Sequence, residues 1–169
     1  AAWKGQRVFF NGVDTGFLSA PTFCDVDADG DPDLFAGGLD GTITFYENGG
    51  TPVAATWELP VSDYAGVDVG TCSVPTFADI DADDDLDLFV GNGEGTIVFY
   101  RNDGSEEGAV WTPAELAYAG INVGHYSAPA FTDIDRDGDL DLFVGDVHGG
   151  LTFYENTGSP TTAAWAAAV

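Results

Sequence analysis

The sequence predicts an all-β fold, a β-propeller of four-stranded antiparallel blades, with three repeats of 54 residues in the chain. The first observation behind this prediction is the repeat itself, which continues without insertions. The second is that each repeat contains short apolar runs bounded by glycine, proline and asparagine, a pattern typical of β-strands. Four antiparallel strands per repeat are typical of a propeller blade, whereas solenoid repeats are shorter and their strands are parallel. Tryptophans mark the period: Trp3, Trp57, Trp111 and Trp165.

Residues 1–169 are expected to form a single domain, because this length suffices for one hydrophobic core. The register of the repeat divides the chain into an outer strand with a link, followed by three blades. The predicted parts are 1–18 (outer strand and link), 19–72 (blade one), 73–126 (blade two) and 127–169 (blade three).

The first three strands of a blade are clearest in the first repeat. The runs 20–23 (APTF) and 33–38 (DLFAGG) are apolar and flank an aspartate-rich loop. In 41–50 (GTITFYENGG), Ile43 and Phe45 alternate with threonines, which is the period of a strand with two different faces. We therefore expect two strands joined by the aspartate loop, followed by a third.

The fourth strand has a weaker pattern. In the first repeat it covers 56–66 (TWELPVSDYAG) and contains Pro60, and its copy in the second repeat contains Pro113, one residue out of register. Proline lacks a donor for the sheet ladder and is tolerated mainly on edge strands. We therefore expect this strand at the outer edge of each blade.

Composition and charge exclude several classes of protein. The chain is 44% hydrophobic and 13% aromatic, which is too apolar for a disordered acidic tail. A net charge of -25 with only four Lys and Arg argues against nucleic acid and anionic membranes as partners. No apolar run approaches the ~20 residues of a membrane span, so no membrane insertion is expected. The chain has no Met and no visible signal peptide, as expected if it is processed, trimmed or excised from a longer protein.

Aspartates are concentrated in three clusters, one per repeat, which hold 16 of the 29 acidic residues. The clusters are Asp25, Asp27, Asp29, Asp31 and Asp33; Asp79, Asp81, Asp83, Asp84, Asp85 and Asp87; and Asp133, Asp135, Asp137, Asp139 and Asp141. Within a tight loop such carboxylates repel one another by roughly 4 kcal/mol per pair at ~4 Å. A hard cation relieves this repulsion, and Ca²⁺ accepts six to eight oxygen ligands in flexible geometry. We therefore expect three structural Ca²⁺ ions per chain.

An EF-hand is excluded by the residues at the end of each aspartate loop. That motif needs a glutamate at loop position twelve and flanking helices. Position twelve is occupied here by Ala36, Val90 and Val144, and each loop continues into an apolar run with the pattern of a strand.

The motifs DVDADGDPDLFAGG, DIDADDDLDLFVGN and DIDRDGDLDLFVGD resemble the FG-GAP/VCBS-type repeat of integrin α-subunit propellers and many secreted bacterial proteins. The resemblance implies that a calcium loop joins the first two strands of each blade. It implies side-chain ligands at loop positions one, three, five and nine and a backbone carbonyl ligand at position seven. The side-chain ligands would be Asp25, Asp27, Asp29, Asp33, Asp79, Asp81, Asp83, Asp87, Asp133, Asp135, Asp137 and Asp141, and the carbonyls those of Asp31, Asp85 and Asp139. The second copy departs from the family because Asp84 stands where the others have Gly30 and Gly138.

Three blades are too few to close a propeller, for which four to eight are usual. We expect closure by oligomerisation: a homodimer of six blades, with a trimer of nine as the larger ring. Residues 3–10 of one chain would then supply the outer strand of the partner's last blade. The alternative is an engineered or excised fragment of a larger surface adhesin, because Trp165–Val169 competes with the opening residues for that place.

A candidate ligand face lies on the side of the blades away from the aspartate loops, where the three copies differ. Its residues are Phe17, Leu18, Asp40, Thr71, Glu94, His125, Tyr126 and His148. Aromatic and polar side chains in loops suit a carbohydrate or protein ligand, while drift among exposed loops is the alternative explanation. The sequence thus predicts a secreted or cell-surface recognition module with lectin-like or adhesive binding, or else a purely structural repeat unit.

Catalysis is not expected, because the carboxylates are committed to metal and the two histidines stand in non-equivalent loops. Cys24 and Cys72 are expected to be small buried residues, since the register places them too far apart for a disulfide.

Overall fold

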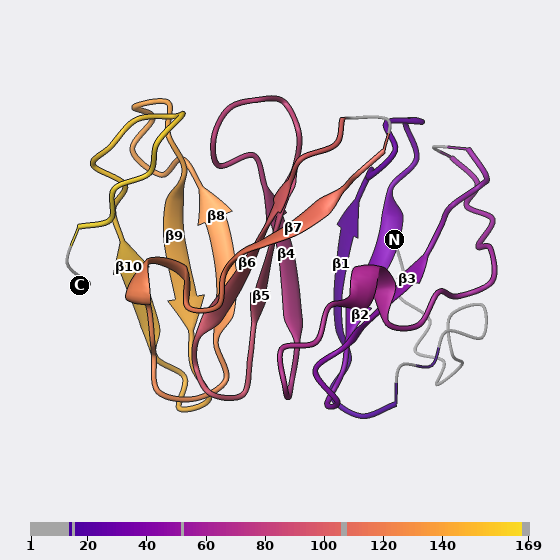
Figure 1. The fold of residues 1–169 in the computed structure, drawn as a ribbon, viewed down its shortest axis with the longest axis horizontal. Coiled ribbons are helices and arrows are strands. Elements are labelled where there is room, and N and C mark those ends of the chain that lie inside the picture. The colour runs from indigo at the N-terminus through magenta and orange to yellow at the C-terminus, as the bar shows by residue number, and fades with distance from the viewer. Residues whose placement is uncertain (1–13, 15, 52, 106–107, 167–169) are drawn as a thin grey trace, which may run out of the picture.

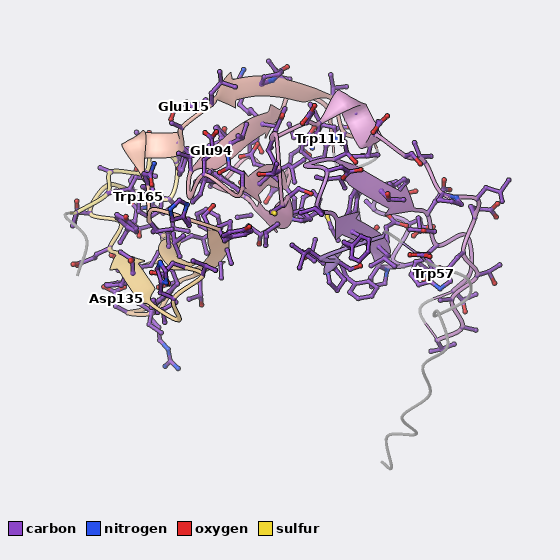
Figure 2. The ribbon with its side chains drawn as sticks, turned by 90° about the horizontal axis from the view of Figure 1, so that it is seen from below. Trp57, Glu94, Trp111, Glu115, Asp135 and Trp165 are labelled. Atoms are coloured by element: carbon purple, nitrogen blue, oxygen red, sulfur yellow. The ribbon has the colours of Figure 1, made fainter. Side chains whose placement is uncertain are left out.

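Three antiparallel β-sheets stand side by side along an arc (Figures 1 and 2). The computed structural model describes residue 14 and residues 16–51, 53–105 and 108–166. The predicted all-β class is confirmed in this part of the chain, where the sheets have three, four and three strands. No helix among these residues has the length and apolar character needed to span a membrane.

The three sheets follow the three repeats in order. The first contains β1 (Ala20–Cys24), β2 (Asp33–Gly37) and β3 (Ile43–Tyr46). The second contains β4 (Val74–Ala78), β5 (Asp87–Gly91), β6 (Ile97–Asn102) and β7 (Trp111–Glu115). The third contains β8 (Ala128–Thr132), β9 (Asp141–Gly145) and β10 (Leu151–Tyr154). Two short 3-10 turns, η2 (Tyr64–Gly66) and η3 (Tyr118–Gly120), lie in equivalent places of the first two repeats.

Strand register is the same in every repeat. Each strand pairs with its sequence neighbour, and the pair Phe23–Leu34 recurs as Phe77–Leu88 and Phe131–Leu142. The first strands β1, β4 and β8 contact one another from sheet to sheet. Because β7 lies at the far edge of its sheet, the strands run from an inner first strand to an outer fourth one.

Within the described part of the chain, the predicted fourth strand is continuous only in the second sheet. There Pro113 lies on the edge strand opposite Tyr100, as expected, and a β-bulge follows. In the first sheet the same segment makes only isolated bridges, from Val61 to Phe45 and from Trp57 to Asn48. Pro60 is equivalent to the residue that the bulge leaves without a ladder partner, so its missing N–H is not needed there.

In the third sheet, whose outer strand was expected from a partner chain, Trp165 of the same chain makes a single bridge to Asn156. Trp165 packs against Phe131 with ring centroids 6.3 Å apart, much as Trp111 packs against Phe77 at 6.0 Å. The C-terminal tryptophan therefore takes the place of a fourth-strand tryptophan in its own sheet. Residues 3–10, expected to complete the last blade of a partner, lie outside the described residues.

The hydrophobic core lies between neighbouring sheets. One cluster joins Phe35 of β2 to Leu88 and Val90 of β5, and a second joins Phe89 to Leu142 and Val144 of β9. Alternate residues of β5 thus face opposite neighbours, and Leu88, Phe89 and Val90 are all fully buried. A strand buried on both faces explains the nearly continuous apolar runs in the sequence.

Close backbone approach fixes the spacing of the sheets. A Cβ added to Gly37 would lie 2.1 Å from the carbonyl oxygen of Ser73, and one added to Gly91 would lie equally close to that of Ser127. The buried Ser127 hydroxyl donates to the carbonyl of Thr96 (2.6 Å) and accepts from the amide of Asn92 (2.9 Å). Glycine and serine at these points allow adjacent sheets to share hydrogen bonds.

Both cysteines are buried and neither forms a disulfide, in agreement with the expectation. Burial, together with the nearby carboxylates of Asp33 and Asp25, raises the pKa of the Cys24 thiol to about 12. The thiol is therefore neutral and serves as a core side chain.

We expect Ser127→Ala to lower the free energy of unfolding by about 1–3 kcal/mol, because it removes two hydrogen bonds at a buried contact between sheets. Urea unfolding followed by tryptophan fluorescence measures the change. Ser105→Ala, at an exposed loop position, is the matched control and should stay within about 0.5 kcal/mol of the parent. An equal loss in both variants would contradict the role given to Ser127.

Candidate metal centre

Three aspartate loops, residues 25–32, 79–86 and 133–140, each join the first and second strands of a sheet. In Figure 1 the connections from β1 to β2 and from β8 to β9 lie at the upper edge of the molecule. The strand pairing brings both ends of each loop together, because Cys24 pairs with Asp33 and Thr132 with Asp141. The loops are therefore held closed by the hairpins that they connect.

Each loop gathers three carboxylates around one point, with one oxygen from each lying within 4.8 Å of the others. The groups are Asp25, Asp27 and Asp29; Asp79, Asp81 and Asp83; and Asp133, Asp135 and Asp141. The first two contain loop positions one, three and five, whereas the third contains positions one, three and nine. All three positions of every group belong to the predicted ligand set.

Several carboxylate oxygens in the loops are buried and accept no hydrogen bond within the described part of the chain. Among them are Oδ1 atoms of Asp25 and Asp31 in the first loop, Asp81 in the second and Asp139 in the third. A buried carboxylate oxygen without a donor costs several kcal/mol unless a cation or a proton compensates it. The loops therefore fit a bound cation, and their all-oxygen donor sets suit a hard one.

The pKa values of several loop carboxyls are raised, in agreement with the need for a compensating cation or proton. Burial raises the pKa of Asp31, Asp85 and Asp139, and neighbouring aspartates raise it further. Burial also raises the pKa of Asp33 to about 6 and that of Asp87 to about 7, despite backbone amides that act in the opposite direction. Without a cation, these carboxyls therefore retain their protons to a higher pH than a free carboxyl does.

Position seven contributes more than the sequence suggested. The resemblance assigned only the backbone carbonyls of Asp31, Asp85 and Asp139 to the metal. The side chains of Asp31 and Asp139 are themselves buried, at 3% and 6% exposure. Burial raises the pKa of Asp31, and the charges of Asp29, Asp25 and Asp27 raise it further, so its carboxyl belongs to the same electrostatic cluster.

Backbone conformation makes the turn of each loop. Position six has positive φ in all three: +92° at Gly30, +72° at Asp84 and +98° at Gly138. The amide there donates to the carboxylate at position one, with distances of 3.0, 3.2 and 3.2 Å. Asp84 therefore adopts a conformation that glycine adopts without strain. Position four is also left-handed, at Ala28, Ala82 and Arg136, which the motif itself does not predict.

The aspartate at position nine connects each loop to the third strand. Asp33 is 1% exposed, and its Oδ1 accepts from the amide of Asn48 (2.8 Å) while Oδ2 accepts from that of Val26 (3.3 Å). In the same way, Asp87 accepts from the backbone amide of Asn102 (2.8 Å), and Asp141 accepts from that of Asn156 (2.9 Å). This carboxylate therefore links the loop to the third strand and is also a candidate metal ligand.

The asparagines are functional residues that the sequence analysis missed. The Asn48 side chain accepts from the amides of Gly50 and Thr56 and donates to the carbonyl of Pro32, and Asn102 and Asn156 repeat this pattern. Each thus ties the loop after the third strand to the aspartate loop. Their spacing of 54 residues was the available signal, but a buried asparagine cannot be told from a turn asparagine by sequence alone.

A family model described as an FG-GAP-like repeat matches residues 25–90 and 79–144, which together cover well over half of the chain. The chain belongs to the FG-GAP-like repeat family. This confirms the resemblance drawn from the aspartate motifs. A search of curated proteins found no significant match.

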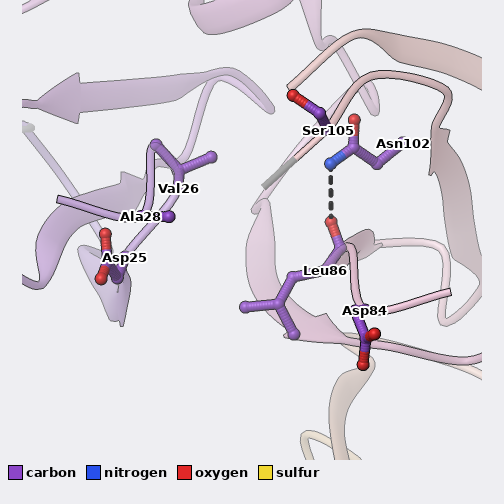
Figure 3. A pocket seen from close by; sticks show the side chains of 7 residues that line it. All are labelled: Asp25, Val26, Ala28, Asp84, Leu86, Asn102 and Ser105. Atoms are coloured by element: carbon purple, nitrogen blue, oxygen red, sulfur yellow. Dashed lines mark hydrogen bonds between the residues drawn. The ribbon is translucent and has the colours of Figure 1, made fainter. Parts of the chain in front are cut away.

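A hollow of about 200 Å³ separates the first FG-GAP loop from the second sheet (Figure 3). Figure 3 shows Asp25, Val26 and Ala28 on one side and Asp84, Leu86, Asn102 and Ser105 on the other. The first loop therefore lies at the junction with the second sheet, and its residues face Asp84 of the second loop.

The candidate ligand-face residues lie at the opposite end of the strands, where the large apolar ones are exposed, with Phe17 at 80%, Leu18 at 61% and Tyr126 at 43%. The amide of Leu39 donates to the carbonyl of Phe17 (2.9 Å), and that of Gly93 to Thr71 (2.8 Å). His125 accepts in the same way from Val147 (3.3 Å). Each link residue therefore lies beside the hairpin that carries Asp40, Glu94 or His148.

We expect Asp84→Gly to raise the free energy of unfolding by about 1 kcal/mol, because it removes a left-handed residue with a side chain and one negative charge. Chemical denaturation measures the change. The reverse substitution at the equivalent position, Gly30→Asp, should destabilise by a similar amount. A loss of stability in Asp84→Gly would show that the Asp84 carboxylate is needed at the site.

The stability of the metal-free protein should rise as pH falls from about 7 towards 4. The folded-state pKa values of Asp33 and Asp87 lie above the ordinary 3.8, so in this window the folded state retains protons that the unfolded state has lost. Saturating Ca²⁺ should reverse the sign, because a bound cation keeps the carboxylates charged and acid displaces it. Urea unfolding in EDTA and in calcium measures both slopes, and identical slopes would contradict the assignment.

Proposed function

We propose that the protein is a calcium-stabilised, propeller-type recognition module that acts outside the cell. The observation that carries the proposal recurs in each repeat: three carboxylates converge, and the same loop contains a buried carboxylate oxygen that lacks a donor among the described residues. One Ca²⁺ per loop, three per chain, would be held by the aspartates at positions one, three, five and nine, with position seven contributing its carbonyl. The FG-GAP-like repeat supports an extracellular location, since such repeats are typical of extracellular proteins.

The ion's role in this proposal is structural. Bound calcium supplies the positive charge that the carboxylates lack, and the protein supplies oxygens fixed by the hairpins and by the backbone amides at position six. The buried Asp33, Asp87 and Asp141 then remain ionised while they hold the ends of the third strands. Calcium would thereby stabilise the sheet that carries each loop.

Recognition is assigned to the edge of the sheets opposite the calcium loops. Phe17 and Leu18 are among the most exposed large apolar side chains of the described residues. A shallow hollow of about 430 Å³ lies there, lined by Gly16, Phe17, Leu39 and Asp40. An aromatic ring beside a carboxylate suits a carbohydrate, whose CH faces pack on rings and whose hydroxyls bind acidic side chains. A backbone hydrogen bond from the amide of Leu39 to the carbonyl of Phe17 (2.9 Å) joins the two sides of this hollow, so little ordering is needed on binding.

A purely structural repeat unit is the second candidate function. It is favoured by the shallowness of the hollow and by the exposure of His125 and His148 to solvent. An enzyme is not proposed, because the clustered carboxylates are assigned to calcium and a catalytic site needs an asymmetric set of groups.

Calcium should raise the melting temperature and EDTA should lower it, with about 2.7 kcal/mol of stabilisation per site at a hundredfold excess over the dissociation constant. Asp27→Ala should remove one of three sites in a calorimetric titration. Glu155→Gln, an exposed acidic position outside the loops, is the matched control and should keep all three. A melting temperature that is the same in calcium and in EDTA would overturn the structural role.

The recognition role is tested separately with a glycan array and a panel of extracellular matrix proteins, both in calcium buffer. A bound glycan should lose affinity about tenfold or more in Phe17→Ala, since stacked aromatic contacts contribute that much. Leu116→Ala, another highly exposed apolar position, should bind as the parent does. Binding to no glycan and no protein would leave the structural repeat unit as the function.

A further inference from the structure

The third sheet ends in an apolar face that the rest of the described chain does not cover. Its residues, here called the trailing face, are Ile134, Phe143, Leu151 and Phe153. Leu151 is 67% exposed and Ile134 is 57% exposed, whereas their counterparts in the second repeat, Ile97 and Ile80, are 0% and 8% exposed. The Phe143 and Phe153 rings pack against each other with centroids 4.8 Å apart, and both remain partly exposed.

The first sheet shows the complementary feature at the other end of the arc. Phe77 contacts the Phe35 ring of the preceding sheet at 4.7 Å, and Phe131 contacts Phe89 at 4.5 Å. Phe23, their counterpart, is 59% exposed and packs against Trp57 at 6.4 Å. The surface beside it forms an apolar hollow of about 420 Å³, here called the leading face, lined by Phe23, Pro32, Asn48, Thr51, Val53, Ala54, Ala55 and Trp57.

We propose that the trailing face of one chain packs on the leading face of a second copy of this chain. The contact continues the one that the chain makes twice within itself. Phe143 of one copy would meet Phe23 of the next, as Phe35 meets Phe77 and Phe89 meets Phe131. The proposal concerns assembly and goes beyond the recognition function, on which it does not depend.

Gly145 provides an independent observation. Its counterparts Gly37 and Gly91 are required within the chain, because a Cβ would lie 2.1 Å from a serine carbonyl of the next sheet. At Gly145 an added Cβ would meet only Ala128, at an ordinary 3.8 Å, so nothing in the described chain requires glycine there. A second copy supplies the reason, because Ser19 occupies the position equivalent to Ser73 and Ser127.

Arg136 adds charge complementarity to the same junction. Position four of the loop is alanine in the first two copies, and Ala28 lines the hollow opposite Asp84 of the next loop. In the third copy this position is Arg136, which is exposed and forms no ion pair with the described residues. The repeat geometry places it opposite the first aspartate loop of the second copy. A chain with four basic residues and a net charge of -25 thus has one of them where its two acidic ends would meet.

Two copies joined in this way bring together six sheets, within the four to eight of usual propellers. The contact is head-to-tail, and a two-fold ring repeats it twice and leaves neither face exposed. Figure 2 shows the arc that the three sheets form, with Trp57 near one end and Trp165 near the other.

Light scattering with size exclusion, in calcium and at moderate salt, tests the assembly. The parent should have twice the mass of one chain. Gly145→Ala should raise the dissociation constant about tenfold or more, since a Cβ in so close a contact forces overpacking, and should leave the circular dichroism spectrum and dilute-protein melting unchanged. Gly91→Ala, the matched change at a junction inside the chain, should instead lower the melting temperature of the single chain.

A parent protein that stays monomeric at every concentration would overturn the proposal. So would an assembly that Gly145→Ala leaves intact, since the contact would then lie elsewhere. Arg136→Glu gives a second readout: it should weaken assembly, and the loss should shrink as salt screens the repulsion. An unchanged or stronger assembly in Arg136→Glu would show that Arg136 does not face the acidic loop of a second copy.

Discussion

The carboxylate that ends each aspartate loop is the interaction on which the rest of the structure depends. Asp33, Asp87 and Asp141 are almost fully buried, and each accepts the amide of an asparagine at the end of the third strand. That asparagine in turn holds the next loop with its side chain. A protonated aspartic acid would accept these bonds less well, and an ionised one needs a counter-charge. A single aspartate side chain in each repeat therefore contributes both to the metal site and to the stability of the sheet.

Sheet packing imposes the second constraint. Neighbouring sheets approach until glycine of one touches the serine backbone of the next, and alternate residues of β5 fill the spaces on both sides. Such a contact fixes the position of each sheet relative to the next, because overpacking or a gap is costly in a close-packed interior. It also explains why the repeat keeps its period of 54 residues without an insertion.

Much of this architecture follows from the sequence. The parts that do not follow from it, the fourth strands and the contacts of the loops, have a common cause. The period, the apolar runs and the aspartate spacing predicted the first three strands of each sheet and the loops between them. Of the two fourth strands predicted among the described residues, only the one in the second repeat is continuous, because edge pairing depends on the local bulge rather than on strand propensity alone. The roles of Asn48 and the left-handed backbone at Ala28 depend on tertiary contacts that a single sequence does not display.

Charge and packing meet at the junctions between sheets. Asp25 and Ala28 of the first loop and Asp84 of the second line the same hollow, so the aspartate clusters of these two repeats face a shared space. Close approach of the sheets brings these clusters together, and neutralising each loop lowers the cost of that approach. Calcium in the loops would thus stabilise the hairpin that holds it and also the contact with the next sheet. At the trailing face, the same repulsion between aspartate loops would oppose the contact between two chains. Arg136, which stands where the first two repeats have alanine, supplies a positive charge there.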